Sequence, residues 1–193
     1  MKQKQRCHWC GDEPLNIQYH DEEWGVPLYE DNKLFELLIL EGMQAGLSWI
    51  TILKKRENFR QAFANFDPKK IATFSDKKVE QLMQNEGIIR NRLKINAVIT
   101  NATAYLELTA HSSLSDYLWQ FTDDRLMNPA RKTFQEIPVN TKESDNMSKA
   151  LKKLGFKFVG TTICYAYMQA IGMVNDHTVD CFRYAQLAKK SKN

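Results

Sequence analysis

The stretch KKLGFKFVGTTICYAYMQAIGMVNDHTVDC, residues 152–181, decides the predicted fold. Gly155 stands where a preceding helix needs a left-handed residue to end, and Gly160 stands where the next helix begins. The four residues between these glycines leave room only for a tight connection. The pattern predicts a helix-hairpin-helix unit over about residues 144–172.

The start of the second hairpin helix is suited to holding a phosphate. Gly160, Thr161 and Thr162 occupy its first positions. Backbone N–H groups there have no partners within the helix, and the helix dipole adds partial positive charge. Contacts of this kind hold a nucleic acid without reading its sequence. The hairpin therefore predicts a sequence-independent contact with DNA.

The patterning outside the hairpin also predicts helices. Residues 32–46 are apolar nearly all round, with Asp31 as the expected N-cap, and Ser48 is expected to cap the following helix. A long amphipathic helix is expected within residues 88–108. Its start carries a basic cluster that suggests a neighbouring anion: Arg90, Arg92 and Lys94. No alternating run predicts a strand, so the expected fold class is all-α.

Composition limits the class of protein. A chain of 193 residues is long enough for one well-buried domain, and we expect a single domain over residues 1–193. The net charge of +4 permits nucleic-acid binding without requiring it. The N-terminus has no apolar signal core, and no run approaches the roughly 18 apolar residues of a membrane span. We therefore expect a cytoplasmic protein with no membrane partner.

Ligands for a soft metal gather toward the two ends of the chain. Cys7 and His20 lie near the N-terminus, and His177 and Cys181 lie four residues apart, one helical turn if they share a helix. These four would form a closed tetrahedral zinc site with a structural role. Spacing alone leaves two alternatives open. Cys10 competes for a ligand position, and free cysteines are often small buried apolar groups.

Glu41 is a carboxylate in an otherwise apolar helix. The three-and-four spacing places it on one face with Leu34, Leu37 and Leu38. A buried carboxylate is costly unless it is paired, so Glu41 is either paired or functional. The alternative is that Gly42 ends the helix nearby and Glu41 reaches water or an arginine.

From Arg6 to about Cys181 the sequence resembles the 3-methyladenine DNA glycosylase I family, alkylation-repair enzymes of the helix-hairpin-helix superfamily. Long and unusual blocks carry this resemblance: YHD at 19–21, EWGVP at 23–27, LEGMQAGLSWITILKKREN at 40–58, GIIRNRLKI at 87–95, GFKFVGTTICY at 155–165 and VNDH at 174–177. The resemblance implies a helix-hairpin-helix DNA glycosylase fold. It also implies a zinc clasp that joins the N-terminal and C-terminal regions.

The resemblance implies a ligand set and a base pocket. The implied zinc ligands are Cys7, His20, His177 and Cys181, which leaves His8 and Cys10 outside the clasp. Glu41 is the implied base-contacting carboxylate, with Tyr19 and Trp49 as aromatic walls and Trp9 nearby. Leu47 is the implied residue that fills the gap left by a flipped nucleotide. Asn16 stands where some relatives carry a tyrosine.

The implied activity is excision of 3-methyladenine from alkylated double-stranded DNA by a monomer. A base methylated at N3 is cationic, and aromatic faces attract it by ~2 kcal/mol when desolvated. Glu41 would accept a hydrogen bond from the exocyclic amine. Because an anion also stabilises the bound cation before reaction, we expect Glu41 to serve selectivity more than rate.

Two departures from the superfamily pattern refine this prediction. Many members carry an essential aspartate after the hairpin, where Asn175 aligns here, although Asp176 is adjacent. Bifunctional members carry a Schiff-base lysine two residues after the second hairpin glycine, where this chain has Thr162. We expect base excision that leaves an abasic site without strand cleavage. The alternatives are a non-enzymatic damage-binding protein and a zinc-stapled helical protein without a nucleic-acid role.

Overall fold

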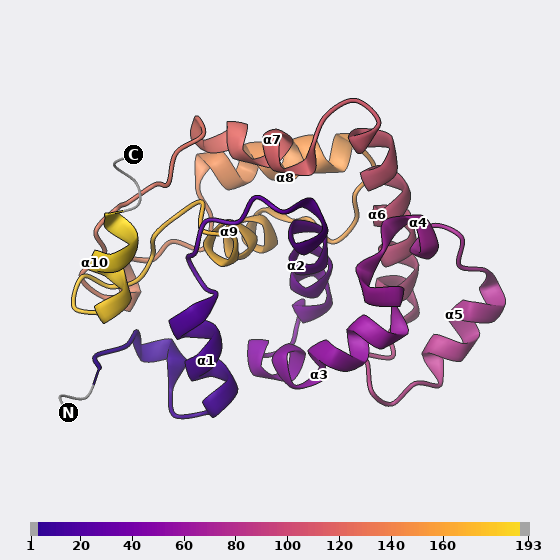
Figure 1. Ribbon diagram of the computed structural model, residues 1–193, viewed down its shortest axis with the longest axis horizontal. Coiled ribbons are helices and arrows are strands. Elements are labelled where there is room, and N and C mark those ends of the chain that lie inside the picture. Colours follow the sequence, from indigo (N-terminus) through magenta and orange to yellow (C-terminus); the bar gives the residue numbers. More distant parts are fainter. Residues whose placement is uncertain (1–3, 190–193) are drawn as a thin grey trace.

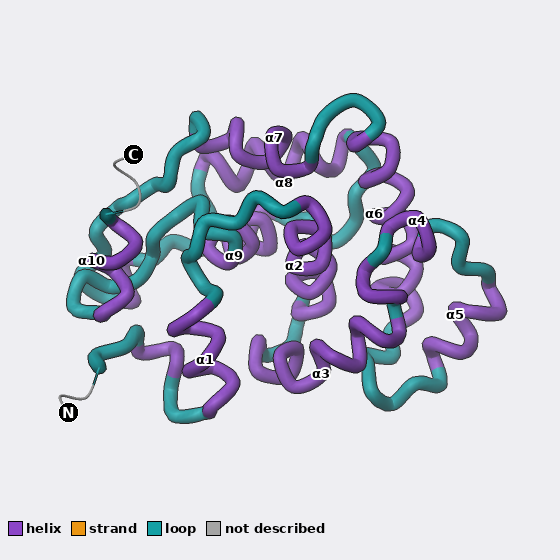
Figure 2. Tube along the Cα trace, viewed as in Figure 1, coloured by secondary structure: helices purple, strands orange, loops and turns teal. Residues whose placement is uncertain are grey.

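The computed structural model describes residues 4–189, and this part of the chain consists of helices and loops without a named strand (Figure 1 and Figure 2). The predicted all-α class is confirmed. The α-helices are α1 (Pro14–Glu22), α2 (Asp31–Gln44), α3 (Trp49–Ala62), α4 (Pro68–Ile71), α5 (Asp76–Met83), α6 (Arg92–Thr109), α7 (Leu114–Trp119), α8 (Lys142–Lys153), α9 (Thr161–Ala170) and α10 (Phe182–Ala188). Short 3-10 helices lie at His8–Cys10, Ala64–Phe66, Gln120–Thr122 and Phe134–Glu136.

Helix α2 lies in the middle of the molecule (Figure 1). It packs against α3, α6, α7 and α9, so nearly its whole circumference is covered. The apolar pattern of residues 32–46 predicted this burial, because a helix that is apolar all round must be enclosed. Leu34, Phe35 and Leu40 have no exposed surface. The helix is therefore a rigid support for the side chains that it carries.

The predicted hairpin is present as α8, a tight loop and α9. Gly155 follows α8 with φ of +92°, a left-handed conformation that strains a residue with a side chain. Gly160 is the N-cap of α9, as predicted. The hairpin loop lies against α2 at Gly42, where an added Cβ would meet the Cβ of Phe158 at 3.2 Å. A glycine at this point of α2 therefore lets the loop approach closely.

Three predicted helix starts differ in detail from the structure. Asp31 is the first residue of α2 and not its N-cap, and its carboxylate instead accepts hydrogen bonds from the N–H groups of Leu114 and Ser115 at the start of α7. Ser48 is the N-cap of α3, but its side chain makes no capping bond. Helix α8 begins two residues before Ser144, because a capping box joins that serine to the N-cap Thr141.

The basic cluster at the start of α6 faces partners within the protein. Arg92 forms a two-point ion pair with Glu80, and Arg90 bonds Glu86. Lys94 points inward and is 7% exposed. The anions beside this cluster are therefore carboxylates of the protein itself, Glu80 and Glu86.

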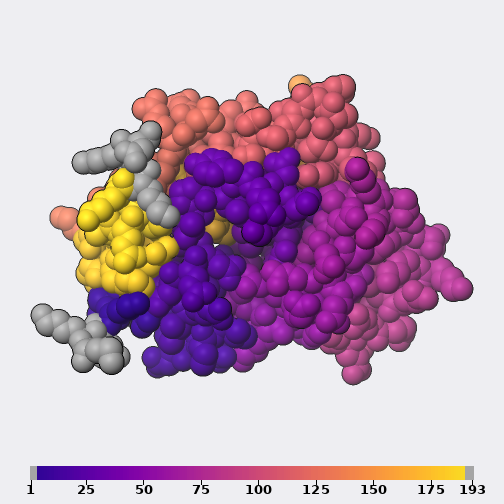
Figure 3. Space-filling view, in the orientation of Figure 1, coloured from indigo at the N-terminus to yellow at the C-terminus, as the bar shows by residue number. Residues whose placement is uncertain are grey.

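The two ends of the described chain lie side by side (Figure 3). The N–H of Phe182, at the start of α10, donates to the carbonyl of Gln5 at 3.0 Å. Residues 1–3 and 190–193 lie outside the described part, so the predicted extent of a single domain over residues 1–193 stays a prediction. Among the described helices, none combines the length and apolar character that a membrane crossing requires.

Candidate active site and metal cluster

A pocket of about 360 Å³ opens between α1, α2, α3, α9 and the loop that follows 3-10 helix Phe134–Glu136. This volume lies within the usual range for small-molecule sites. The lining residues are Trp9, Tyr19, Trp24, Glu41, Gln44, Trp49, Phe134, Ile137, Pro138, Val139, Thr162, Tyr165, Ala166 and Gln169. The pocket thus combines mainly apolar walls with a few polar groups.

Glu41 contributes the only carboxyl group in the pocket lining that the structure describes. It is 3% exposed, and its Oε2 atom has no hydrogen-bond partner. Burial raises the pKa of Glu41 to about 8. The alternative in which Gly42 ends the helix and frees Glu41 is wrong, because α2 continues to Gln44. A carboxyl group without a partner in an apolar pocket is a candidate for ligand recognition.

Aromatic rings surround this carboxyl group. The ring centroids of Tyr19 and Trp49 lie 5.1 Å apart, and those of Trp9 and Trp24 lie 4.9 Å apart. The indole N–H groups of Trp9 and Trp49 are buried and have no acceptor. Buried polar groups in folded proteins are normally paired. Two residues of the lining, Trp9 and Trp49, thus carry unpaired donors, and Glu41 carries an unpaired carboxyl oxygen.

The hairpin meets this pocket at the first turn of α9. Thr162 is exposed and lines the pocket. The hydroxyl of Thr161 bonds instead to Asp145 and Ser144 of α8, which ties the two hairpin helices together. The first intrahelical N–H donor is Cys164, which bonds Gly160 O at 2.8 Å. The amides before Cys164 are therefore the unpaired start of the helix.

Leu47 and Asn16 lie outside the pocket lining. Leu47 is 39% exposed on the turn between α2 and α3, three residues after Gln44 of the lining. Asn16 lies on α1, and its side-chain oxygen is buried without a partner. The structure thus brings Glu41, Tyr19 and the two predicted tryptophans together and leaves these two residues beside the pocket.

Several lining residues were not predicted from the sequence. Tyr165, Ala166 and Gln169 follow Thr162 at helical spacing, so the face of α9 that carries Thr162 was a signal that could have found them. Trp24 lies within the EWGVP block. The far wall, made by Phe134, Ile137, Pro138 and Val139, comes from irregular chain with no periodic pattern to indicate it.

Neither residue at the position of the superfamily aspartate offers a free carboxylate. The side-chain nitrogen of Asn175 donates to Asn128 Oδ1 and to the carbonyl of Tyr184. Asp176 is 1% exposed. Its carboxylate accepts from Tyr165 Oη at 2.5 Å, Gln169 Nε2 at 2.9 Å and Arg131 Nε at 3.4 Å. Asp176 therefore holds two residues of the pocket lining, Tyr165 and Gln169, in place.

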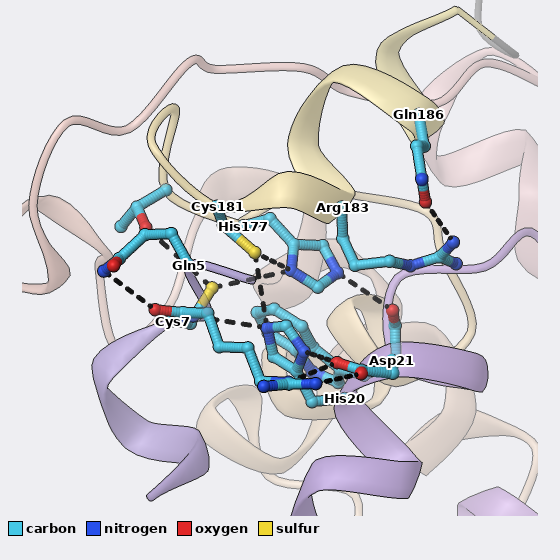
Figure 4. A network of polar contacts seen from close by, with 11 residues as sticks. Gln5, Cys7, His20, Asp21, His177, Cys181, Arg183 and Gln186 are labelled. Carbon is cyan, nitrogen blue, oxygen red and sulfur yellow. Dashed lines mark hydrogen bonds and ion pairs between the residues drawn. The ribbon is translucent and has the colours of Figure 1, made fainter. Parts of the chain in front are cut away.

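The four predicted metal ligands converge in a buried cluster (Figure 4). The ligand atoms of Cys7, His20, His177 and Cys181 all lie within 4.8 Å of one another. Cys181 Sγ is 3.4 Å from His20 Nε2, and both sulfurs are 3.5 Å from His177 Nδ1. The cluster could hold a metal ion, and it joins the N-terminal and C-terminal regions.

The outer nitrogens of both histidines are held in place. His20 Nδ1 lies 2.8 Å from Asp21 Oδ1, and His177 Nε2 lies 3.1 Å from the carbonyl of Trp24. Partners of this kind orient metal-binding histidines and leave the other ring nitrogen free for the ion. The hydrogen bond with Cys7 lowers the pKa of Cys181, and the same contact together with burial raises the pKa of Cys7. A divalent cation would allow both thiols to ionise.

The helical turn expected between His177 and Cys181 is wrong. Residues 173–175 are extended, because Met127 exchanges backbone hydrogen bonds with Met173 and Asn175. His177 therefore lies in a loop, and Cys181 is the N-cap of α10. Cys10 is fully buried and His8 is exposed, and neither belongs to the cluster.

Comparisons with known proteins agree over nearly the whole chain. A family model described as methyladenine glycosylase matches residues 9–184. The DNA-3-methyladenine glycosylase 1 of Escherichia coli (strain K12) is 54% identical over 181 residues, which cover 93% of this chain and 97% of that protein. The DNA-3-methyladenine glycosylase of Haemophilus influenzae is 48% identical over 177 residues, which cover 91% and 96%.

Solved structures show the same likeness. A crystal structure of a 3-methyladenine DNA glycosylase I superposes with a TM-score of 0.91 at 54% identity, covering 92% of this chain and 98% of that one. The 3-methyladenine DNA glycosylase I of Staphylococcus aureus, solved to explain 3-methyladenine recognition, gives a TM-score of 0.89 at 34% identity, with coverages of 92% and 95%.

Proposed function

This chain belongs to the methyladenine glycosylase family and is a DNA-3-methyladenine glycosylase that excises 3-methyladenine in DNA repair, and from this premise we propose how its residues carry out the reaction. Membership in this family excludes the two alternatives, a damage-binding protein without activity and a helical protein without a nucleic-acid role. The roles of individual residues are our proposal.

The flipped base enters the pocket beside Glu41. Tyr19 and Trp49 supply aromatic faces for the cationic ring, and Glu41 accepts a hydrogen bond from its exocyclic amine. The observation that carries this assignment is the buried, unpartnered Oε2 of Glu41 within the aromatic pocket. The positive charge of the base opposes the effect of burial and favours the ionised form of Glu41 when the base is bound.

Excision then cleaves the bond between the base and the sugar. The bonding electron pair stays with the base and neutralises its charge, while water supplies the hydroxyl group at the sugar carbon and releases a proton. Glu41 is the only carboxyl group that the described pocket lining offers, since Asp176 is bonded to Tyr165 and Gln169. The charge on the leaving base therefore carries much of the activation.

The enzyme acts without strand cleavage. Cleavage through a Schiff base requires an amine in the pocket. Thr162 occupies the relevant position of the hairpin helix, and no lysine lines the described pocket. The product is an intact strand with an abasic site.

The test is incubation of the purified protein with methylated duplex DNA, with assays of released bases and of nicking before and after alkali. We expect released 3-methyladenine and breaks only after alkali treatment. Breaks before alkali, in a preparation free of other nucleases, would contradict the proposed absence of strand cleavage.

The metal in the clasp is zinc, held by Cys7, His20, His177 and Cys181. Zinc bond lengths of about 2.3 Å to sulfur and about 2.0–2.1 Å to nitrogen place ligand sulfur and nitrogen atoms about 3.5 Å apart in a tetrahedron. The sulfur–nitrogen distances of 3.4 Å and 3.5 Å in the cluster fit this geometry. Four protein ligands leave no open position, so the zinc serves to tie the chain ends together.

The hairpin holds the DNA through the amides of Gly160, Thr161 and Thr162. An added Cβ at Gly160 would meet no atom within 4 Å, so this surface is open to a ligand. The enzyme binds double-stranded DNA as a monomer in the cytoplasm. The start of α9 supplies a phosphate contact that does not depend on sequence.

Gly160→Asp is expected to weaken binding to undamaged duplex DNA about tenfold. The aspartate would place negative charge where the phosphate is held, while remaining a good N-cap for α9. The matched control is Gly160→Asn, which is an equally good N-cap without the charge. Affinity is measured at several salt concentrations. Equal affinity of Gly160→Asp and the unmodified enzyme would show that the hairpin is only scaffold.

A further inference from the structure

Lys94 is a buried cation without a carboxylate partner. It lies in the first turn of α6 and is 7% exposed, and it forms no ion pair with any residue that the structure describes. Its ammonium donates to the carbonyls of Met43 at 2.7 Å and Ala45 at 2.6 Å. Burial of a charge costs free energy that these two hydrogen bonds must offset. The burial of the Lys94 ammonium at this cost therefore needs an explanation.

The two carbonyls belong to the end of α2 and the turn that follows it. Between them, the carbonyl of Gln44 accepts from the N–H of Leu47 at 2.6 Å. Three successive carbonyls, at residues 43–45, are therefore held by hydrogen bonds. A positive charge at the C-terminus of a helix is also favourable to the helix dipole. Lys94 thus caps α2 from a neighbouring helix and holds the turn that presents Leu47.

The same helix also holds the hairpin loop. Asn101 lies two turns after Lys94 on α6, and its side-chain amide bonds both the N–H and the carbonyl of Lys157, at 2.7 Å and 3.1 Å. Helix α6 is therefore a common support for the Leu47 turn and for the loop that precedes Gly160. Two elements assigned to DNA contact keep a defined spacing because one helix binds both.

We propose that Lys94 is a positioning residue for base flipping, because its ammonium fixes the turn from which Leu47 fills the gap in the duplex. This inference rests on the role that the family resemblance implies for Leu47, filling the gap left by a flipped nucleotide. Neither Lys94 nor the two residues that it bonds, Met43 and Ala45, line the base pocket, so we expect its effect on flipping to exceed its effect on recognition of the base. Without the ammonium, the turn can adopt other conformations and the leucine is less often in place.

The test combines Lys94→Met with Leu47→Ala. Lys94→Met keeps the length of the side chain and removes the donor. We expect it to lower the rate of 3-methyladenine release from duplex DNA about tenfold, as loss of hydrogen bonds from a charged group would. The affinity for free 3-methyladenine, followed by tryptophan fluorescence, should stay within about twofold, since the pocket is intact. Lys77→Met, an exposed substitution on α5, controls for the lost charge.

The double variant decides whether Lys94 acts through Leu47. If it does, Lys94→Met should cost less than about twofold once Leu47 is already alanine. Losses that multiply, or a parallel loss of affinity for the free base, would overturn the proposal. Full activity of Leu47→Ala alone would instead contradict the proposed role of Leu47. If Lys94→Met fails to fold, Lys94→Gln, which keeps a neutral N–H donor, enters the same cycle with a smaller loss expected.

Discussion

At enzyme concentrations below saturation, Glu41→Gln is expected to slow release of 3-methyladenine from methylated duplex DNA about 10- to 100-fold, because a neutral amide oxygen binds the cationic base more weakly than a carboxylate does. The amide has nearly the same shape as the carboxyl group, so the pocket and fold should be kept. It cannot carry the negative charge that the cationic base favours. The measurement is the rate of base release, with binding of free 3-methyladenine measured alongside.

The matched control is Glu36→Gln, on the same helix. The Glu36 carboxylate pairs with Arg60 at 2.8 Å and lies outside the pocket lining. Base release by this variant should equal that of the unmodified enzyme. Unchanged release by Glu41→Gln would remove Glu41 from the site, whatever its burial.

The same substitution should change how stability depends on pH. The folded-state pKa of Glu41, about 8, lies above the ordinary value of 4.5. Between these values the folded chain binds more protons than the unfolded chain, so Glu41 makes the free energy of unfolding fall as pH rises. Glu41→Gln removes this slope. At pH 8 the variant should be at least about 1 kcal/mol more stable, a rise of about 2–4 °C in Tm.

Thermal unfolding measured from pH 5 to pH 8.5 checks this second effect. The difference in Tm between Glu41→Gln and the unmodified enzyme should grow with pH. A constant difference would mean that Glu41 is ionised in the folded protein throughout this range, so that burial does not raise its pKa.

Cys181→Ser is expected to cause the largest loss of stability. If zinc stands a thousandfold above its dissociation constant, loss of the metal costs about 4 kcal/mol, or roughly 8–16 °C in Tm for a chain of this size. Zinc content and Tm should fall together, because hydroxyl oxygen is a poor zinc ligand. Metal analysis and thermal unfolding are the measurements.

The control is Cys10→Ser, since Cys10 is also buried but lies outside the cluster. This variant should keep a full complement of zinc. A chelator should lower the Tm of the unmodified enzyme toward that of Cys181→Ser and leave that variant unchanged. Full zinc in Cys181→Ser would place the metal elsewhere in the chain.

The parts of the fold that could be predicted have local signals. Gly155 and Gly160 stand five residues apart and marked the hairpin, and the apolar run of α2 indicated its burial. The same run placed Glu41 on an apolar face, but it left open whether Gly42 ended the helix and freed the carboxylate, which the structure decided. The ligand set of the clasp was different: spacing left alternatives open, and resemblance to a family selected the four residues that the structure brings together.

What could not be predicted depends on contacts distant in sequence. Lys94 follows Arg90 and Arg92 closely, and no local pattern shows that only the lysine turns inward. Its direction is set by carbonyls 49 and 51 residues away. His177 likewise leaves helical geometry because Met127 pairs with the extended chain before it. Sequence periodicity describes one helix or strand at a time, and it does not show contacts between residues that are distant in the sequence.

The positions of the four ligands in the sequence also determine when the cluster can form during protein synthesis. Cys7 and His177 are separated by 170 positions, and Cys181 follows later still. A ribosome adds about 5–20 residues per second, so roughly 10–35 s pass between the synthesis of Cys7 and that of Cys181. During that interval α1 can already pack against α3, whereas Cys7 and His20 still lack the two ligands of the C-terminal region. If the cluster holds the proposed zinc, its closure is a late step that follows synthesis and depends on metal supply.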